Sequence, residues 1–475
     1  MIGTRNPILN LVMLITVTVG LIVGTKVFLT SQAANTAETF VAESVEAFYI
    51  AENGSDTGSG SIAEPFASLS RARDAMRASS TVKTVYLRGG TYNVSQMLTL
   101  TAADSGETWS SYPGEKAIID GTDQVFSSPK NASLILIQGG SDITVNGLEI
   151  RNFHGSGINI HGGPAYFDLL VNGSHTLPAT GPAHSNIISN NTIHDGDGNL
   201  PGYYWFSAVG AFGDVQNTVI KNNAIYNLMS QGIVLKLLQM GPKNGISNSV
   251  IENNYVQNVN INYEDAGGIY TIDRTRSSSG VKITNNYVRD YGAGNDATKG
   301  IYLDDDMSNA AVTGNIVAGK GHFPIQYHIG GNNQVSGNIL DLGDDGSKSA
   351  VLLQVTKGGN SFSGNIILSS YTGSGSFAFL EVDVPGVAPV IRDNLYWNYT
   401  GGTTRSDGNT VNDVNPVRAN PMISCWNYQI APGSLALLAP VRFTPIAGYW
   451  GPPGFQVPQT GTAPSSPHSA PCRPL

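Results

Sequence analysis

The chain is poor in charged residues, which make up only 13% of its 475 positions. Lysine and glutamate, both good helix formers, are scarce, while Gly, Asn, Thr, Ser, Ile and Val fill the middle of the sequence. This balance argues against a helical protein and favours β-strands joined by tight turns. A chain of this length can bury a large core, and its length alone would permit two or three domains.

Basic residues are in the minority, because 26 Lys and Arg stand against 35 Asp and Glu and give a formal net charge of −9. A nucleic-acid partner requires a basic face, so none is predicted. The same balance argues more weakly against a polyanionic substrate, since local charge can override the total.

Cysteine is almost absent, with only Cys425 and Cys472 in the chain. Two cysteines fit an oxidising compartment. They leave two alternatives open, a disulfide that ties down the C-terminal tail or two unpaired thiols.

Residues 1–34 are predicted to be a targeting segment. Arg5 precedes an apolar run from Ile8 to Val23, and small residues follow as far as Ala34. We expect a cleaved secretory signal, with an uncleaved N-terminal anchor as the alternative. In either case we expect the folded part to be exported: secreted, periplasmic or on the cell surface. It meets a membrane only through residues 8–23, and only if the segment is retained.

An internal repeat, clearest between residues 251 and 315, organises the rest of the chain. A β-rich phrase closing on Asn occurs there as IENNYV and ITNNYV, and each copy precedes a Gly-Ile-Tyr strand, GGIYTID or KGIYLDDD. The copies begin 32 residues apart, at Ile251 and Ile283. A fixed period in this range is typical of one supersecondary unit stacked on its neighbours.

Asparagine recurs at the end of the first strand in each repeat, at intervals of 23 to 32 residues. An inward Asn at such a corner can stack its amide on the next one and satisfy backbone groups at the bend, while Ile and Val fill the interior. The predicted ladder comprises Asn191, Asn223, Asn254, Asn286, Asn315, Asn338, Asn365 and Asn394.

The second strand of each repeat alternates between inward and outward residues. The predicted inward row is Ile158, Ile233, Ile269, Ile301 and Ile325. One outward row is Asn159, Val234, Tyr270, Tyr302 and Gln326, and the next is His161, Lys236, Ile272, Asp304 and His328. Adjacent rungs of such a parallel sheet lie about 4.7–4.9 Å apart.

The region before the repeats carries a more specific pattern. A strand at residues 48–51, a GSD loop, a helix from Phe66 to Ala78, and the phrases VYLRGGTY, DSG and YPGEKAIIDG follow in that order. Together they resemble the N-terminal cap of right-handed parallel β-helix proteins of the pectate-lyase-like superfamily. The APGSLAL phrase at residues 431–437 resembles the C-terminal closing segment of the same family.

The resemblance implies an all-β fold, a single-stranded right-handed parallel β-helix with a short N-terminal capping helix, acting on carbohydrate. We expect one domain at 47–452, with the cap and first coils at 47–125, repeating coils at 140–400 and a closing segment at 411–452. Residues 453–475 are rich in Pro and Ser and are predicted to be disordered. The expected state is a monomer, and the expected partner is a poly- or oligosaccharide.

Acidic residues crowd both Gly-Ile-Tyr strands, with Glu264 and Asp265 before the first and Asp304, Asp305 and Asp306 at the end of the second. The phrases YEDAGGIYT and GIYLDDDMSN resemble those around the acidic pair of some β-helix glycoside hydrolases. This resemblance implies catalytic roles for Asp265 and for Asp304 or Asp305. The alternative is an acidic turn that caps backbone groups or is merely solvated.

Glycoside hydrolysis needs two carboxyl groups, about 5–5.5 Å apart for retention or about 6.5–9.5 Å for inversion. One of them must be protonated. We expect the crowding of like charges to raise one carboxyl pKa and so provide the acid.

Further side chains are predicted to contact substrate. Tyr270 and Tyr302 offer flat faces for a sugar ring, unless they only stabilise the sheet. Lys236 and His328, in the outer row, would contact substrate or tune a carboxylate, unless they are incidental surface residues. Glu264 completes the predicted set.

Metal-ligand patterns are weak. The DGDGN loop at Asp195–Asn199 has oxygen ligands for Ca²⁺, but it lacks the spacing and the closing Glu of an EF-hand. His154 and His161 have no metal-ligand spacing. No cofactor is predicted, and Ca²⁺ is the one ion left open.

Three functions remain for this scaffold. A glycoside hydrolase is favoured because the densest cluster is acidic. A polysaccharide lyase or uronate epimerase would need a Lys or Arg base and a cation that neutralises the uronate, for which Lys236, Arg274 and Arg276 are available. The third is a non-catalytic, glycan-binding surface protein. The fold cannot separate these functions.

Overall fold

The computed structural model describes residues 47–125, 132–163, 166–170, 173–177, 180–198, 206–237, 243–262, 265–292, 298–343, 351–354, 356–370, 380–384, 386–399, 413–423, 428–446 and 448–457. The chain divides into two units, 1–44 and 45–475, and only the second contains described residues. The predicted targeting segment, Glu264 and both cysteines lie outside the described residues. Within the described part, no helix has the length and apolar character needed to span a bilayer.

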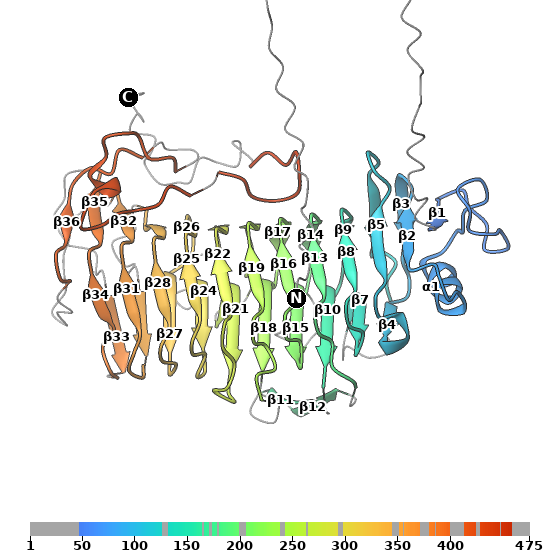
Figure 1. Ribbon diagram of the computed structural model, residues 1–475, viewed down its shortest axis with the longest axis horizontal. Coiled ribbons are helices and arrows are strands. Elements are labelled where there is room, and N and C mark those ends of the chain that lie inside the picture. Colours follow the sequence, from blue (N-terminus) through green and yellow to red (C-terminus); the bar gives the residue numbers. More distant parts are fainter. Residues whose placement is uncertain are drawn as a thin grey trace, which may run out of the picture. The chain divides into compact units, whose positions relative to one another are not determined.

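Three parallel sheets surround a common core, and successive strands along the chain pass from the first sheet to the second and then the third (Figure 1). The predicted parallel β-helix is therefore confirmed. The first sheet consists of β1 (Phe48–Ile50), β2 (Thr84–Leu87), β5 (Thr108–Ser111), β8 (Thr144–Asn146), β13 (Ile187–Ser189), β16 (Val219–Lys221), β19 (Val250–Glu252), β22 (Lys282–Thr284), β25 (Ala311–Thr313), β28 (Gln334–Ser336), β31 (Ser361–Ser363) and β34 (Val390–Arg392).

The second sheet consists of β3 (Gly90–Asn93), β6 (Ala117–Asp120), β9 (Glu149–Arg151), β14 (Thr192–Gly196), β17 (Ala224–Leu228), β20 (Tyr255–Gln257), β23 (Tyr287–Arg289), β26 (Ile316–Ala318), β29 (Ile339–Asp341), β32 (Ile366–Ser369), β35 (Leu395–Asn398) and β36 (Val417–Arg418). The third consists of β4 (Leu98–Thr101), β7 (Ser133–Gln138), β10 (Ser156–Gly162), β15 (Ser207–Gly213), β18 (Gln231–Leu237), β21 (Ala266–Asp273), β24 (Thr298–Asp304), β27 (Phe323–His328), β30 (Val351–Gln354) and β33 (Leu380–Val384). An antiparallel hairpin, β11 (Tyr166–Leu170) and β12 (Gly173–Leu177), stands apart from these sheets.

The N-terminal end carries one α-helix, α1 (Leu69–Ala78), which contacts β1 and β4. It begins three residues later than the predicted Phe66, because the Ser68 side chain caps it by accepting the Arg71 N–H at 3.2 Å. Phe66 instead packs its ring 5.4 Å from that of Phe48. The helix buries Leu69, Ala72, Ala75 and Met76, and it lies against the edge strands β1 and β4, whose unpaired backbone groups would otherwise be open to another chain.

The interior is apolar along its length. All five isoleucines of the predicted inward row are fully buried, and the strand registers place them side by side. Val209 of β15 joins this row between Ile158 and Ile233. The sequence SAVGAFG has no Gly-Ile phrase, and for that reason the repeat pattern missed β15.

The predicted asparagine ladder is confirmed, and all eight of its members are fully buried. Asn254 is representative: its Oδ1 accepts from both the backbone N–H and the Nδ2 of Asn223, each at 3.0 Å. Its own Nδ2 donates to the Ile220 carbonyl at 2.9 Å and to Asn286 Oδ1 at 3.0 Å. The ladder ends at Asp413, whose Oδ2 accepts from Asn394 Nδ2 at 2.9 Å.

After β36 the chain runs back over the outer face of the second sheet (Figure 1). Buried side chains from this segment, among them Phe443 and Trp450, join outward residues of β20 to β35 in one apolar cluster. The packing continues to Val457, beyond the boundary expected at 452, and the Phe455 ring lies 5.3 Å from that of Tyr255. The C-terminal segment therefore covers the second sheet, while the acidic strands singled out by the repeat lie on the third sheet, whose outer face we term the wall.

Candidate functional site

The acidic cluster lies on the outer face of the third sheet, on β21, β24 and β27. The register pairs Tyr270 with Tyr302 and Ile272 with Asp304, as the two predicted outward rows require. Asp304 is the last residue of β24. Asp305 and Asp306 then adopt positive φ angles of 27° and 69°, which turn the chain out of the strand. Asp304 is therefore the member of the acidic run that belongs to the outward row.

Asp304 is buried and engaged by several donors. Its Oδ2 accepts from the Tyr270 hydroxyl at 2.5 Å, and its Oδ1 lies 2.5 Å from Nδ1 of His328. Burial opposes ionisation, but the hydrogen bonds from His328 and Tyr270 outweigh it and hold the pKa of Asp304 below its ordinary value. Asp304 is therefore a carboxylate at neutral pH.

His328 is half-buried beside this carboxylate, at the end of β27. Burial alone would lower the pKa of His328, but Asp304 and then Asp305 raise it above the ordinary value. Among the described residues, no hydrogen bond engages its Nε2. His328 can therefore carry a proton near neutral pH and present an N–H on Nε2.

The two tyrosines are not the open platforms that the sequence suggested. Tyr270 is 1% exposed and Tyr302 is 2% exposed, and their rings meet edge to face with centroids 5.2 Å apart. The Tyr270 hydroxyl donates to the Asp304 carboxylate, and burial together with the nearby Asp304 charge raises the pKa of both hydroxyls. Both tyrosines are therefore neutral, and Tyr270 is a donor to Asp304.

Asp265 lies just before β21 and is the open carboxylate of the wall, with 70% of its side chain exposed. Its Oδ1 is 2.7 Å from Nζ of Lys299, and that Nζ lies 4.3 Å from the centroid of the Tyr302 ring. The chain of contacts from Asp265 through Lys299 and Tyr302 to Asp304 keeps both carboxylates on one outer wall.

Each carboxylate of the wall has a cationic partner. The pairs are Asp265 with Lys299, Asp304 with His328, Asp305 with Arg274, and Asp306 with Arg276 and Lys357. The expectation that crowded like charges would provide a protonated acid is therefore wrong for Asp304, because positive groups alternate with the negative ones.

Lys299 is the member of this wall that sequence reasoning missed. The register places it opposite Gly267, and it is buried. The sequence contained a clue to Lys299, because the KGIYLDDD copy of the repeat has Lys at the position where the GGIYTID copy has Gly. Lys236, a predicted substrate contact, is buried two rungs before Asp304 in the same outward row.

Three side chains of the acidic cluster could hold a metal ion only if one of their present contacts were broken. One ligand atom each from Asp304, Asp305 and His328 lies within 4.8 Å of the others. A metal ion held by His328 Nδ1 and Asp304 Oδ1 would have to separate these two atoms, whereas Arg274 contacts only Oδ2 of Asp305. In the DGDGN loop, the carboxylates of Asp195 and Asp197 lie 2.7 Å from ring nitrogens of His194 and His154, respectively.

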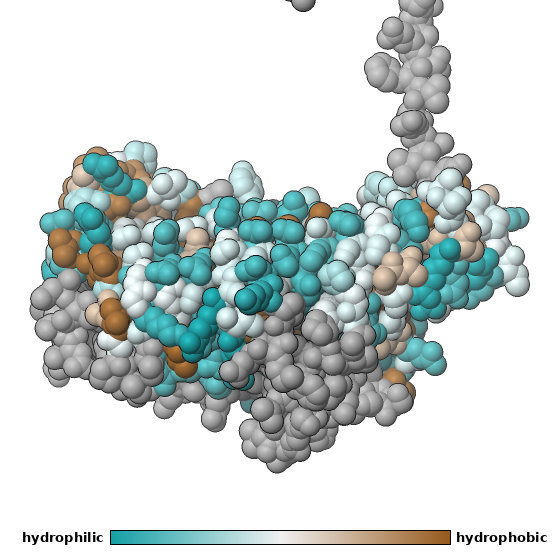
Figure 2. Space-filling model, turned by 60° about the horizontal axis from the view of Figure 1, so that its bottom comes forward, coloured by the Kyte–Doolittle hydropathy of each residue, from teal (hydrophilic) through white to brown (hydrophobic). Residues whose placement is uncertain are grey.

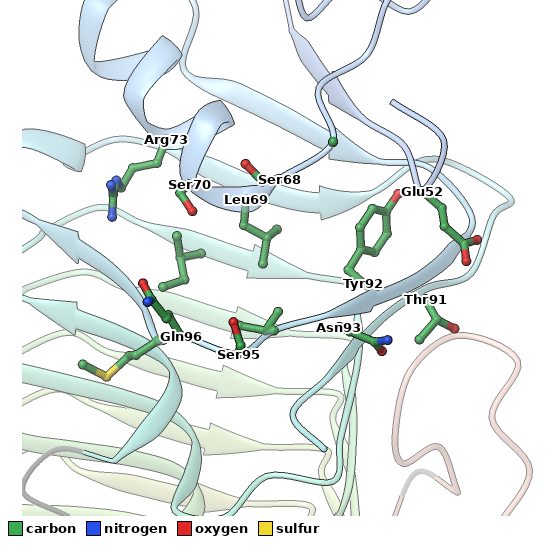
Figure 3. Close-up of a pocket in the computed structure, with 14 residues that line it drawn as sticks. Glu52, Ser68, Leu69, Ser70, Arg73, Thr91, Tyr92, Asn93, Ser95 and Gln96 are labelled. Atoms are coloured by element: carbon green, nitrogen blue, oxygen red, sulfur yellow. The ribbon is translucent and has the colours of Figure 1, made fainter. Parts of the chain in front are cut away.

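The side of the stack that carries the third sheet faces forward in Figure 2, where hydrophilic side chains cover the middle and most strongly hydrophobic ones stand near the C-terminal end. A separate hollow of about 450 Å³ lies at the N-terminal cap. Figure 3 shows Ser68, Ser70 and Arg73 of the helical side facing Ser95 and Gln96 across it. It shares no residue with the carboxylate wall.

Two family models match the chain. The Pel9A-like right-handed β-helix region matches residues 48–198, and the right-handed β-helix region matches residues 133–295. No curated protein matches the sequence.

Several solved structures are similar to the chain. The native GH136 lacto-N-biosidase from Eubacterium ramulus is similar over 78% of this chain and 67% of its own, at 13% identity and a TM-score of 0.53. The structure of XylC with xylose is similar over 79% and 87%, at 13% identity and a TM-score of 0.48. A rhamnogalacturonan lyase is similar over 79% and 87%, at 15% identity and a TM-score of 0.40. At these identities the likeness concerns the fold and not the reaction.

Proposed function

Because this chain is a right-handed parallel β-helix protein, a fold used by carbohydrate-active enzymes, we propose that it is an exported glycoside hydrolase that acts on the outer face of β21, β24 and β27. One observation carries the proposal: the Asp304 carboxylate holds His328 in a state that can donate a proton from that face.

His328 is the proposed general acid. Glycosidic cleavage requires a proton on the leaving oxygen, and the Asp304 carboxylate, by raising the pKa of His328, favours the protonated imidazole. Nδ1 is committed to Asp304, so the proton would leave from Nε2. Asp304 is buried and acts as a positioning residue, since it orients the ring and stabilises its charge.

Asp265 is the proposed reacting carboxylate. Hydrolysis requires a carboxylate that either attacks the anomeric carbon or activates water. Asp265 is the most exposed acid of the wall, and Lys299 holds its Oδ1. The proposed substrate is a poly- or oligosaccharide that meets the protein at the exposed side chains of Asp265 and His328.

A second candidate is a lyase or epimerase of uronate-containing glycans. The positions of Lys299 and Arg274 favour it, because both cations lie beside the Asp304 site and would neutralise a substrate carboxylate. In that reaction Tyr302 or His328 would exchange a proton at the carbon next to the uronate carboxylate.

Activity screening tests these proposals. Purified full-length protein would be incubated with neutral and acidic plant, algal and bacterial glycans, and the products assayed for reducing ends and for unsaturated uronates. We expect new reducing ends without unsaturation. An unsaturated product would favour the lyase, and binding without turnover would favour a non-catalytic protein.

The Asp265→Asn variant tests the site itself. We expect it to lose at least about 10²-fold in turnover with its circular dichroism spectrum unchanged. Asp74→Asn, at an exposed carboxylate on α1, is the matched control and should retain full activity. Full activity in Asp265→Asn would remove the hydrolase assignment.

A further inference from the structure

A second hollow, of about 460 Å³, lies between the corner that joins the first and second sheets and residues 440–445 of the C-terminal segment. Figure 1 shows this segment running back over the stack. The volume falls within the range of about 300–1,000 Å³ that is typical of ligand pockets. The hollow shares no residue with the carboxylate wall or with the hollow at the N-terminal cap.

The floor of this hollow is a row of corner residues in the left-handed conformation. Gly314, Gly337 and Gly364 occupy the row in three successive coils, with φ angles of 65°, 64° and 62°. In earlier coils the same position also has a positive φ angle but holds Asn, namely Asn190, Asn222, Asn253 and Asn285. The backbone conformation alone therefore does not require glycine there.

Gly337 leaves a space that packing does not require. Apart from its chain neighbours, no heavy atom lies within 4 Å of the place where its Cβ would stand. A Cβ at Gly364, by contrast, would lie 3.1 Å from the Val441 carbonyl oxygen. Glycine at 364 therefore lets the C-terminal segment approach the corner, whereas glycine at 337 keeps the middle of the hollow open.

A row of hydroxyl groups forms one side of the hollow. Thr313, Ser336 and Ser363 end β25, β28 and β31 and lie in register, about 4.8 Å from one coil to the next. The residue before each is buried in the core, so the hydroxyls point outward. Those of Ser336 and Ser363 make no hydrogen bond in the described part of the chain. Pro440 and Pro445 add apolar surface to the lining.

The charged groups that line the hollow balance each other. They are the Asp393 carboxylate and the Arg442 guanidinium. The carboxylate is already engaged, because Arg392 Nε lies 2.6 Å from its Oδ2 and Asn415 Nδ2 lies 3.1 Å from its Oδ1. The hollow therefore offers free hydroxyl groups and apolar surface without a net charge, a combination that suits a neutral sugar better than an acidic one.

We propose that this hollow is a carbohydrate-binding site for a short, neutral stretch of a glycan chain, separate from the proposed active site. Sugar hydroxyls would hydrogen-bond to Ser336 and Ser363, while the apolar face of a sugar ring packs against Pro440 or Pro445. The site is built from the first sheet and the C-terminal segment, so it goes beyond the proposed function and does not depend on catalysis at Asp265.

Calorimetric titration tests the site in the absence of turnover. Size-graded xylo-, cello- and galacto-oligosaccharides would be titrated into the full-length Asp265→Asn protein, with oligogalacturonates as the acidic series. We expect a neutral series to bind. A further Gly337→Asn substitution should weaken that binding at least about tenfold, because its side chain fills the hollow. Asparagine tolerates the left-handed conformation, so this variant should fold.

Gly147→Asn is the matched control. Gly147 stands at the same corner position of an earlier coil, outside the hollow, with a φ angle of 69°, and a Cβ there would lie 3.7 Å from Ser111 Cβ. This variant should bind as the parent does. Ser336→Ala, which removes a free hydroxyl and leaves the backbone unchanged, should weaken binding. Equal binding by the parent and Gly337→Asn, preference for the acidic series, or no binding of any named series would overturn the site.

The two proposals fail separately. If the wild-type protein cleaves a glycan but Gly337→Asn binds oligosaccharides as the parent does, the hydrolase stands and the binding site falls. If no glycan is cleaved but binding is lost in Gly337→Asn and retained in Gly147→Asn, the binding site stands and the hydrolase falls.

Discussion

Asp304 shows how partners can outweigh burial in setting the charge of a single residue. Burial disfavours a carboxylate, yet two hydrogen bonds of 2.5 Å, from the His328 imidazole and the Tyr270 hydroxyl, favour the ionised form. The same contact raises the pKa of His328. The pairing of Asp304 with His328 therefore favours both the ionised carboxylate and the protonated imidazole.

Asp304→Asn should change the pH dependence of activity. A general acid works only while protonated, so activity falls as pH rises through the pKa of His328. The neutral amide cannot stabilise the imidazolium, so that pKa falls and the alkaline limb of kcat should move to lower pH. A profile that keeps its alkaline limb while kcat drops would assign Asp304 a role other than positioning His328.

Glu107, near the N-terminal cap, is a buried acid outside the proposed site. Its Oε2 accepts from Trp109 Nε1 at 3.0 Å, and its Oε1 has no partner among the described residues. Burial raises the pKa of Glu107 to about 7. The folded protein therefore holds this proton more tightly than the unfolded chain, and the stability from this group is lost as pH rises through about 7.

Glu107→Gln should remove that dependence while keeping an acceptor for Trp109. We expect the free energy of unfolding to increase by about 2 kcal/mol near pH ~8 and to change little near pH ~4. Urea denaturation at the two pH values measures the difference. Parallel pH curves for parent and variant would show that Glu107 does not titrate between these two pH values.

At the scale of the element, the asparagine ladder stabilises the corner between the first and second sheets. Each amide oxygen accepts from the backbone N–H of the ladder asparagine in the preceding coil, which an apolar residue cannot do. The corner can therefore be buried along eight successive coils without unsatisfied backbone groups at these positions.

Asn254→Ala should be costly for that reason. It leaves the buried Asn223 N–H and the Ile220 carbonyl without their side-chain partners, at about 1–3 kcal/mol each. Asn146→Ala is the control, because that amide bonds only partly buried side chains on the outer surface. Chemical denaturation should show a larger loss in the free energy of unfolding for Asn254→Ala than for Asn146→Ala. Equal losses would contradict the proposed role of the ladder.

At the scale of the whole β-helix, stability comes from contacts between neighbouring coils and from the C-terminal segment that crosses several of them. Repeat proteins gain stability mainly from nearest-neighbour interfaces. The C-terminal segment adds contacts between residues far apart in sequence, such as the 2.8 Å hydrogen bond from the Tyr428 hydroxyl to Asp341.

Phe443→Ala should loosen this segment before the coils. Truncating a buried aromatic side chain costs about 3–5 kcal/mol, and here the loss falls on the segment itself. Limited proteolysis should release fragments from residues 428–457 while a core containing β10 to β18 persists. Tyr449→Ala, at a side chain that is 84% exposed, is the control. Simultaneous digestion of the whole chain would show that the segment and coils unfold as one unit.

The repeat phrases predicted the fold because each phrase forms the same strands of its coil, and successive coils stack in the order of the sequence. Ile269 and Ile301 are inward, Tyr270 and Tyr302 are outward, and the Asn positions stack as the spacing indicated. The site was less predictable. Asp265 and Asp304 were predicted, and His328 was expected to contact substrate or tune a carboxylate, but the burial of both tyrosines and the presence of Lys299 were not predicted.

The amino-acid sequence by itself determined the coil period, the inward and outward faces, and the wall on which acidic residues gather, because each follows from strand alternation and the repeat. Only the tertiary structure decided the charge of each group. That charge depends on desolvation and on partners from other coils, such as His328, which is 24 residues from Asp304 in sequence yet directly bonded to it.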